Sequence, residues 1–121
     1  GLRSLVRACE AVLFCTPEYA GALPGSFKNL LDWLVGDDKA GSMYGKPVGW
    51  INASSRASPS GGADAHASLA RVLGYIGAQP VDAACQRMPT TRNDVGPDGL
   101  ITDPDLRDRI GRVVRALLDP G

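Results

Sequence analysis

The side chains best suited to nucleophilic chemistry in this chain are four serines and the histidine that follows them. A serine nucleophile needs a base and a third group that orients the base, and neither a GxSxG segment nor another spacing here supplies that set. Serines in a segment rich in glycine and proline are usually turn formers. Hydrolysis is therefore the weaker hypothesis, and we expect the histidine to be partly exposed or hydrogen-bonded. The serines are Ser54, Ser55, Ser58 and Ser60, and the histidine is His66.

The three cysteines, Cys9, Cys15 and Cys85, match no metal or disulfide pattern. Their number is odd, they fall in expected helix and strand positions, and no CxxC is present. With a single histidine in the chain, a Cys/His metal site is hard to assemble. We therefore expect no metal site, reduced cysteines that pack as small apolar residues, and a cytoplasmic location.

The charge balance argues against a nucleic-acid or membrane partner. Thirteen basic residues offset thirteen acidic ones, so the formal net charge is zero, and no long-range field would draw the protein to DNA or to an anionic bilayer. No apolar run is long enough to cross a membrane, and no signal peptide is visible. The length of 121 residues fits one domain.

Hydrophobic periodicity divides the chain into alternating helices and strands. Short apolar runs suit strands buried on both faces, and apolar residues three and four apart suit helices. Gly77 is a natural C-cap, and Asp103 followed by Pro104 is a natural helix start. The expected strands are 11–15, 47–53 and 81–85, and the expected helices are 2–10, 24–36, 63–77 and the segment from Pro104 onward. This last helix would bury Leu106, Ile110, Val113, Val114 and Leu117 and expose Arg107, Asp108, Arg109 and Arg112.

Two long loops, 16–25 and 52–62, form the expected ligand site. Strands separated by helices are parallel, and ligands of such sheets bind beyond the carboxyl ends of the strands, where both loops begin. Glycine lets the main chain approach a flat ligand closely, and free N–H groups can donate to its carbonyl groups. The loops therefore predict a site for a planar ring such as a flavin, which carries its own redox chemistry.

The first loop and the helix after it resemble a known family. Residues 16–33, TPEYAGALPGSFKNLLDW, resemble the signature TPEYNGxxPGxxKNxxDW of the NADPH-dependent FMN reductases, which include quinone, azo-dye and chromate reductases. Segments 45–54, 61–62, 69–73 and 98–104 also resemble the family, so the resemblance covers essentially the whole chain. It implies a flavodoxin-like, three-layer αβα fold with a parallel sheet.

The resemblance also implies a function and roles for single residues. Members of this family use bound FMN to pass electrons from NAD(P)H to a second acceptor: a flavin, a quinone, an azo compound or a metal oxyanion. No side chain need act as an acid or a base. The family's helix after Pro24 is often a dimer contact, so a homo-oligomer (dimer or tetramer) is expected. The implied cofactor-binding residues are Pro17, Glu18, Tyr19, Ala20 and Gly21, largely through main-chain groups, with Ser54, Ser55, Gly61 and Gly62 in the second loop.

Two departures from the family pattern bear on the cofactor. Ala20 stands where the family usually has asparagine, so a polar contact near the ring would be lost. Nothing here resembles the family's phosphate segment GSxRxxS or its first two strands, so residues 1–121 would be the C-terminal portion of one domain, with the family's strands 3-4-5. We therefore expect an open apolar edge at 12–14 and weak or no FMN binding. Two alternatives stay open: a non-catalytic flavin-binding or interaction module, and an inactive fragment.

Overall fold

A parallel sheet of three strands forms the centre of the molecule. The computed structural model describes residues 1–119, with strands β1 (Val12–Thr16), β2 (Pro47–Asn52) and β3 (Gln79–Arg87) in the order β1-β2-β3. Both strand pairs are parallel, and Thr16 lies opposite Asn52 at the end of the β1–β2 ladder. The expected α/β class with a parallel sheet is therefore confirmed.

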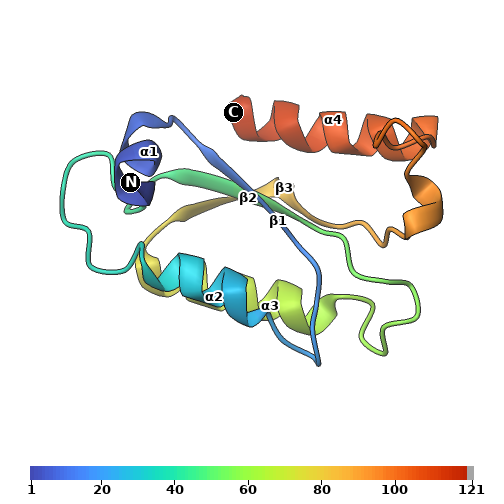
Figure 1. Ribbon diagram of the computed structural model, residues 1–121. Helices are drawn as coiled ribbons and strands as arrows, with labels where there is room; N and C mark the ends of the chain where they lie inside the picture. Colours follow the sequence, from blue (N-terminus) through green and yellow to red (C-terminus); the bar gives the residue numbers. More distant parts are fainter. Residues whose placement is uncertain (120–121) are drawn as a thin grey trace.

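Helices cover both faces of this sheet (Figure 1). α2 and α3 lie on one face and α4 lies on the other, which gives the three expected layers. Within residues 1–119, no helix is long and apolar enough to span a bilayer. The helices are α1 (Leu2–Ala8), α2 (Gly25–Asp32), α3 (Ala63–Ile76) and α4 (Pro104–Leu118), with a short 3-10 helix, η1, at Arg92–Asp94.

Side chains that alternate along the strands supply two separate cores, one on each face of the sheet. Complete burial of a leucine or phenylalanine side chain contributes about 1.5–3 kcal/mol, so these cores hold the layers together. Toward α2 and α3 the core contains Phe14, Val48 and Trp50 with Leu31, Leu69 and Leu73. Toward α4 it contains Ile51 and Ala84 with Leu106, Val113 and Leu117.

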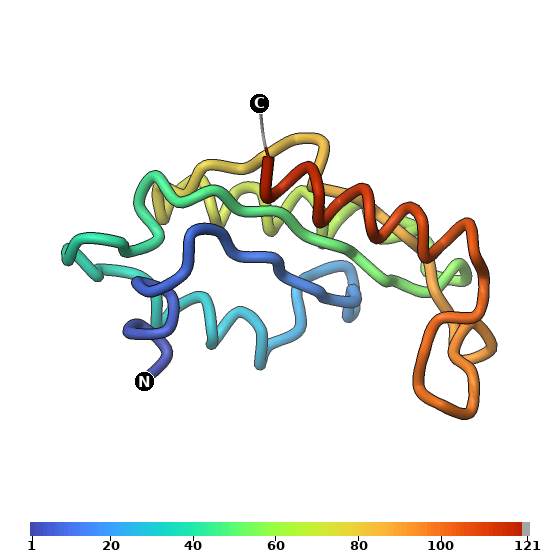
Figure 2. Tube along the Cα trace, turned by 90° about the horizontal axis from the view of Figure 1, so that it is seen from above, coloured from blue at the N-terminus to red at the C-terminus, as the bar shows by residue number. Residues whose placement is uncertain are grey.

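One face of β1 is more exposed than its apolar sequence predicts. Leu13 is 39% exposed and Cys15 is also exposed, whereas Phe14 and Thr16 are buried. α4 packs on β3 and β2, and the view from above shows it lying over those strands rather than over β1 (Figure 2). The expectation that this strand is buried on both faces is therefore wrong for β1 in the described residues. The exposed face agrees with the other expectation, an open apolar edge at 12–14.

Several element boundaries also differ from expectation. α2 ends at Asp32 and not at Gly36, because the chain tightens into turns in which Leu34 N–H donates to the Leu31 carbonyl. β3 extends beyond the expected 81–85, where a register shift between Val48 and Trp50 interrupts its pairing with β2. The expected caps are confirmed: Gly77 has a φ of 87°, and the Asp103 carboxylate accepts a hydrogen bond from Asp105 N–H.

α4 has the expected apolar stripe with one exception. Val114 is 36% exposed and Ile110 is half-buried, whereas Leu106, Val113 and Leu117 are buried. Successive helical residues point about 100° apart, so Val114 cannot share the side of the helix on which Val113 lies. The charged residues expected to be exposed are exposed, although Arg109 and Arg112 border β3. They are Arg107, Asp108, Arg109 and Arg112.

A buried lysine closes the C-terminal end of α1. Lys46 is only 7% exposed, and its Nζ donates to the carbonyl oxygens of Val6 at 2.6 Å and Cys9 at 2.5 Å. Carbonyl groups at a helix C-terminus lack partners within the helix, and an ammonium group also suits the negative end of the helix dipole. A helix of 7 residues is unstable alone, so Lys46 fixes α1 to the start of β2.

We predict that Lys46→Met lowers the free energy of unfolding by about 2–3 kcal/mol, because hydrogen bonds to a charged group are lost while the carbonyl groups stay buried. Methionine retains the apolar stem. Urea unfolding followed by circular dichroism measures the change, and the exposed Lys39→Met is the matched control. Equal stability of the two variants would show that the Lys46 ammonium does not fix α1.

A hydrogen bond joins the histidine to the buried tryptophan of β2. Trp50 Nε1 donates to His66 Nδ1 at 3.0 Å, and the two rings meet edge to face with centroids 5.2 Å apart. Because Nδ1 accepts, neutral His66 carries its proton on Nε2. Burial, and then the charge of Arg87, lowers the pKa of His66. The expected hydrogen-bonded histidine is therefore confirmed, and Trp50, at 2% exposed, belongs to the core.

This lowered pKa predicts a pH dependence of stability with a definite sign. The unfolded chain takes up the proton at a higher pH than the folded chain does, so the contribution of neutral His66 is present above about pH 6.5 and is lost as the pH falls. His66→Asn keeps an acceptor for Trp50 but does not titrate. The stability advantage of the unaltered chain over His66→Asn should shrink between pH 7 and pH 5 in urea titrations; a constant difference would contradict the assignment.

Candidate functional site

The two loops expected to bind the ligand leave the sheet side by side. The first follows Thr16 and the second follows Asn52, which are paired neighbours. Ala53 N–H donates to the Thr16 carbonyl at 2.9 Å, which continues the ladder by one residue into the second loop. Beyond it, Met88 N–H donates to the Asn52 carbonyl at 2.8 Å. The parallel register therefore places both loops at one edge of the sheet, as the sequence predicts.

The first loop carries a two-residue hairpin turn. Tyr19 N–H donates to the Ala22 carbonyl at 2.9 Å, and Ala22 N–H donates back to the Tyr19 carbonyl at 3.0 Å. Between them, Ala20 has a φ of 50° and Gly21 a φ of 75°. Positive φ at both central residues defines the type I′ turn, which favours Asn-Gly. The backbone conformation thus favours the asparagine that the family usually has at this position over the Ala20 of this chain, apart from any contact with a ligand.

The second loop is closed by the side chain of Asn52. This residue is 1% exposed; its Nδ2 donates to the Gly62 carbonyl at 2.8 Å, and its Oδ1 accepts from the Ser54 N–H at 3.2 Å and from the Ser54 hydroxyl. Gly62 has a φ of 89°, and a Cβ there would lie 3.1 Å from Asn52 side-chain atoms. Glycine is therefore required where the loop returns to α3.

Glu18 joins the first loop to the second. Its Oε2 accepts from the hydroxyls of Ser58 at 2.8 Å and Ser60 at 2.6 Å, and its Oε1 accepts from Ala65 N–H at 2.8 Å. The Ser60 hydroxyl, the Ala65 amide and then the Ser58 hydroxyl stabilise the ionised carboxylate and hold the pKa of Glu18 below its ordinary value despite an opposing desolvation. The carboxylate is therefore charged at neutral pH.

A hollow of about 240 Å³ lies between the two loops. Its wall contains two acidic residues, Glu18 and Asp64, and none of the residues that line it is a lysine or an arginine. Such a wall repels a phosphate group, whereas a neutral ring suffers no such repulsion. The lining residues are Glu18, Ala20, Gly21, Ser58, Pro59, Ser60 and Asp64.

Both loops contain main-chain N–H groups that are free to bind a ligand. Within residues 1–119, the N–H groups of Glu18, Ala20 and Gly21 in the first loop make no hydrogen bond, and those of Ser55 and Arg56 in the second make none either. Unpaired amide donors are uncommon in folded proteins unless water or a ligand satisfies them. The loops can therefore donate to the carbonyl oxygens and ring nitrogens of a planar ligand.

The structure brings the expected cofactor residues to one place, but their side chains differ in exposure and in hydrogen bonding. Tyr19 is 62% exposed and Ser55 is exposed, whereas the Ser54 hydroxyl is buried and bonded to Asn52. The hydroxyls of the candidate nucleophiles Ser58 and Ser60 donate to the Glu18 carboxylate instead. His66 Nδ1 accepts a hydrogen bond from Trp50. No Ser–His pair is formed among the described contacts. Sequence reasoning missed Asn52, although a polar residue that ends an apolar strand is a signal for a structural role.

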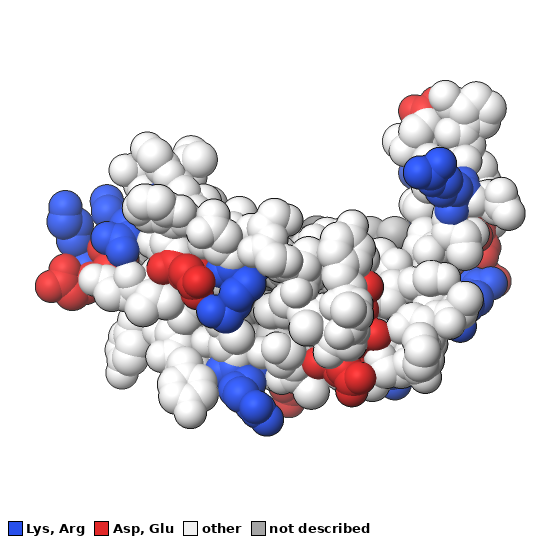
Figure 3. All heavy atoms as spheres, turned by 60° about the horizontal axis from the view of Figure 1, so that its bottom comes forward, with Lys and Arg blue, Asp and Glu red and all other residues white. Residues whose placement is uncertain are grey.

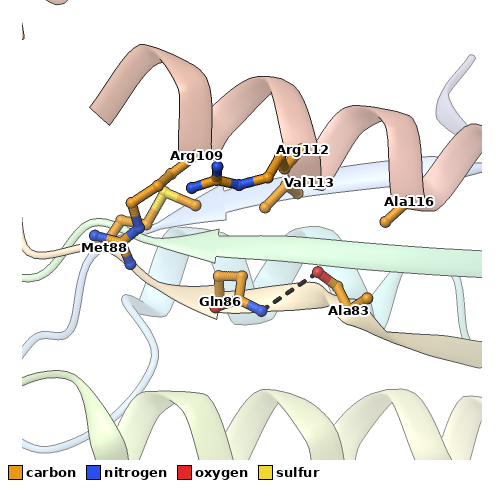
Figure 4. A pocket seen from close by; sticks show the side chains of 7 residues that line it. All are labelled: Ala83, Gln86, Met88, Arg109, Arg112, Val113 and Ala116. Atoms are coloured by element: carbon orange, nitrogen blue, oxygen red, sulfur yellow. Dashed lines mark hydrogen bonds between the residues drawn. The ribbon is translucent and has the colours of Figure 1, made fainter. Parts of the chain in front are cut away.

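A second hollow, of about 280 Å³, lies between β3 and α4 on the other face of the sheet (Figure 4). Two arginine side chains from successive turns of α4 reach over it, and Gln86 Nε2 donates to the Ala83 carbonyl at 3.3 Å. It contains none of the residues that the family resemblance assigns to the cofactor. Within residues 1–119, no cluster of His, Cys, Asp and Glu is able to hold a metal ion. The residues around the hollow are Ala83, Gln86, Met88, Arg109, Arg112, Val113 and Ala116.

The turn geometry predicts that Ala20→Asn stabilises the protein by about 1 kcal/mol, because a left-handed backbone costs most L-residues about 1–2 kcal/mol and asparagine tolerates it. Thermal or urea unfolding measures the gain. Ala22→Asn, at an exposed hairpin position without positive φ, is the matched control and should gain nothing. A loss of stability in Ala20→Asn would show that the turn is not type I′.

Comparison with known proteins agrees with this geometry. Residues 1–89 match the family model of the NADPH-dependent FMN reductases. An NAD(P)H-dependent FMN reductase of Pseudomonas aeruginosa is 30% identical over 115 residues, which are 95% of this chain and 60% of that protein. An NADPH azoreductase of a Bacillus species is 34% identical over 101 residues, which are 80% of this chain and 52% of that protein. The chain thus spans about half to three fifths of the length of these relatives.

A solved structure is similar along nearly the whole chain. The flavoenzyme FerB of Paracoccus denitrificans, an NAD(P)H:(acceptor) oxidoreductase, superposes with a TM-score of 0.71 at 28% identity, over 97% of this chain and 63% of FerB. Because the family model covers well over half of the residues and the structural likeness covers almost all of them, the chain belongs to the NADPH-dependent FMN reductase family and has its flavodoxin-like fold.

Proposed function

We propose that this chain supplies the ring-binding part of an oxidoreductase that passes electrons from NAD(P)H through FMN to a second acceptor. The observation that carries this proposal is that two loops with free amide groups leave adjacent strands side by side and have a hollow between them. Membership of the family supports it, since members are named for FMN reduction with NADPH. We also propose that residues 1–121 belong to a single flavodoxin-like domain and are not divided between two domains.

The residues present fit a flavin ring better than its phosphate. The N–H groups of Glu18, Ala20, Gly21, Ser55 and Arg56 offer donors to ring carbonyls and nitrogens, and acidic side chains line the hollow. When bound, the flavin would accept a hydride from NAD(P)H and hand electrons on. The chain's own part is to bind the ring and orient it, and no described side chain is needed as an acid or a base.

The second acceptor, the assembly and the cellular location are parts of the same proposal. The relatives are named for the reduction of FMN, azo compounds and quinones, so we propose a small-molecule acceptor of this kind and a homo-oligomer in the cytoplasm. The side of the molecule that α2 and α3 form has charged side chains separated by uncharged areas (Figure 3). Trp33 is 64% exposed and Tyr75 is 89% exposed, and exposed apolar residues on such a face suit a contact between copies.

One observation favours the alternative of a flavin-binding module without turnover. The described hollow lacks a cationic residue for the phosphate, and an arginine clamp is what normally fixes a phosphate in place. A ring held at one edge only would bind weakly and be poorly oriented for hydride transfer. The acidic wall therefore supports ring binding by this chain more strongly than it supports catalysis.

We predict that the 121-residue chain binds riboflavin and FMN with affinities within about threefold of each other, both weak, because the phosphate gains no attractive contact. Quenching of flavin fluorescence measures both affinities. Arg109→Ala combined with Arg112→Ala, in the other hollow, is the control and should leave both unchanged. An FMN affinity more than about tenfold above that of riboflavin would contradict ring-only binding.

NADPH oxidation in the presence of each flavin separates the enzyme from the alternatives. Oxidation that saturates with flavin concentration supports the reductase. Bound flavin without oxidation supports the non-catalytic module, and a colourless, inactive chain supports the inactive fragment.

A further inference from the structure

We propose that Glu18 is a positioning residue whose carboxylate holds the second loop in the arrangement that presents its amide groups to the flavin ring. This inference rests on the proposed function for the identity of the ligand. The hydrogen-bond contacts themselves, however, can be tested in the ligand-free protein. The resemblance assigns Glu18 to cofactor binding, but its carboxylate is occupied by the protein.

Both oxygens of the Glu18 carboxylate have protein donors. Three hydrogen bonds connect it to residues 40 to 47 positions later in the chain. Two donors, the Ser58 and Ser60 hydroxyls, lie in the second loop, and the third, Ala65 N–H, lies in the first turn of α3. Since that N–H is among those a helix leaves unpaired, Glu18 ties the first loop to both the second loop and the helix that follows it.

A charged carboxylate suits this position better than any neutral group. Its two oxygens accept all three donors at once, and hydrogen bonds to an ionised acceptor are about twice as strong as neutral ones. The positive end of α3, a helix of 14 residues, further favours a negative charge beside Ala65. Glutamine would keep one acceptor for Ala65 N–H but would have to turn its amide group toward the two hydroxyls.

The serines that Glu18 holds lie next to the free donors of the second loop. Ser58 N–H donates to the Ser55 carbonyl at 3.0 Å, and Gly61 N–H donates to the Ser58 carbonyl at 3.0 Å, so these turns move together with the hydroxyls. The unpaired N–H groups of Ser55 and Arg56 sit at the start of the same turns. Glu18 therefore acts on the ligand by holding the loop, because both oxygens of its carboxylate already accept from protein donors.

The test compares Glu18→Ala, Glu18→Gln and the double variant Ser58→Ala/Ser60→Ala in the 121-residue chain. Glu10 is the only other glutamate and is exposed, so Glu10→Ala and Glu10→Gln are matched controls. Amide hydrogen exchange of segment 54–66 in flavin-free protein reports the order of the loop. Riboflavin affinity reports the effect on the site, because riboflavin carries the ring without the phosphate.

We expect Glu18→Ala to speed exchange in 54–66 and to weaken riboflavin binding, each by at least about tenfold. Glu18→Gln should rescue part of both, since Ala65 N–H keeps its acceptor. The double serine variant should weaken binding while Ala65 N–H stays protected, a pattern that general loss of folding would not produce. The Glu10 variants should change neither quantity.

Unchanged exchange in Glu18→Ala would overturn the positioning role, as would faster exchange with unchanged riboflavin affinity. If the unaltered chain binds no flavin, the proposed function fails and the role toward a flavin fails with it. Exchange in the variants would then still show separately whether Glu18 holds the loop.

Discussion

Parallel pairing of β1 with β2 is the constraint on which the candidate site depends. With Thr16 opposite Asn52, two loops begin at adjacent positions on one edge of the sheet. The buried side chains of Phe14, Val48 and Trp50 fix that register, because a slip of one residue would turn them toward the other face. This register brings the Glu18 carboxylate within reach of hydroxyl groups 40 and 42 residues away along the chain.

Elements with a strong hydrophobic period could be predicted from the sequence, and so could the edge of the sheet at which the loops meet. Those features depend on local patterns and on the chirality of crossovers. The partners of Glu18 and the closing role of Asn52 could not, because they depend on contacts between segments that only the folded chain brings together. The exposure of Leu13 shows the same limit, since an apolar strand does not reveal which of its faces a helix covers.

The site is built from backbone groups, and side chains whose polar atoms are bonded within the protein hold its two loops in place. Asn52 and Glu18 hold the two loops in shape, and the turn with positive φ at Ala20 and Gly21 leaves the N–H groups of both residues without a protein acceptor. Two carboxylates and no basic side chain line the hollow, which suits a neutral ring and disfavours a phosphate, although Arg87 Nη1 donates to the carbonyl of Ser60 in its wall at 3.4 Å. A cofactor with its own redox chemistry needs this kind of support: orientation and hydrogen bonds, without a protein acid or base.

We propose that the amide groups of these two loops bind a flavin ring. Amide chemical shifts of the isotope-labelled chain during a riboflavin titration test it most directly. We expect saturable shifts that are largest at Glu18, Ala20, Gly21, Ser55 and Arg56. Shifts centred on the hollow between β3 and α4, or none in either loop as the flavin binds, would contradict it.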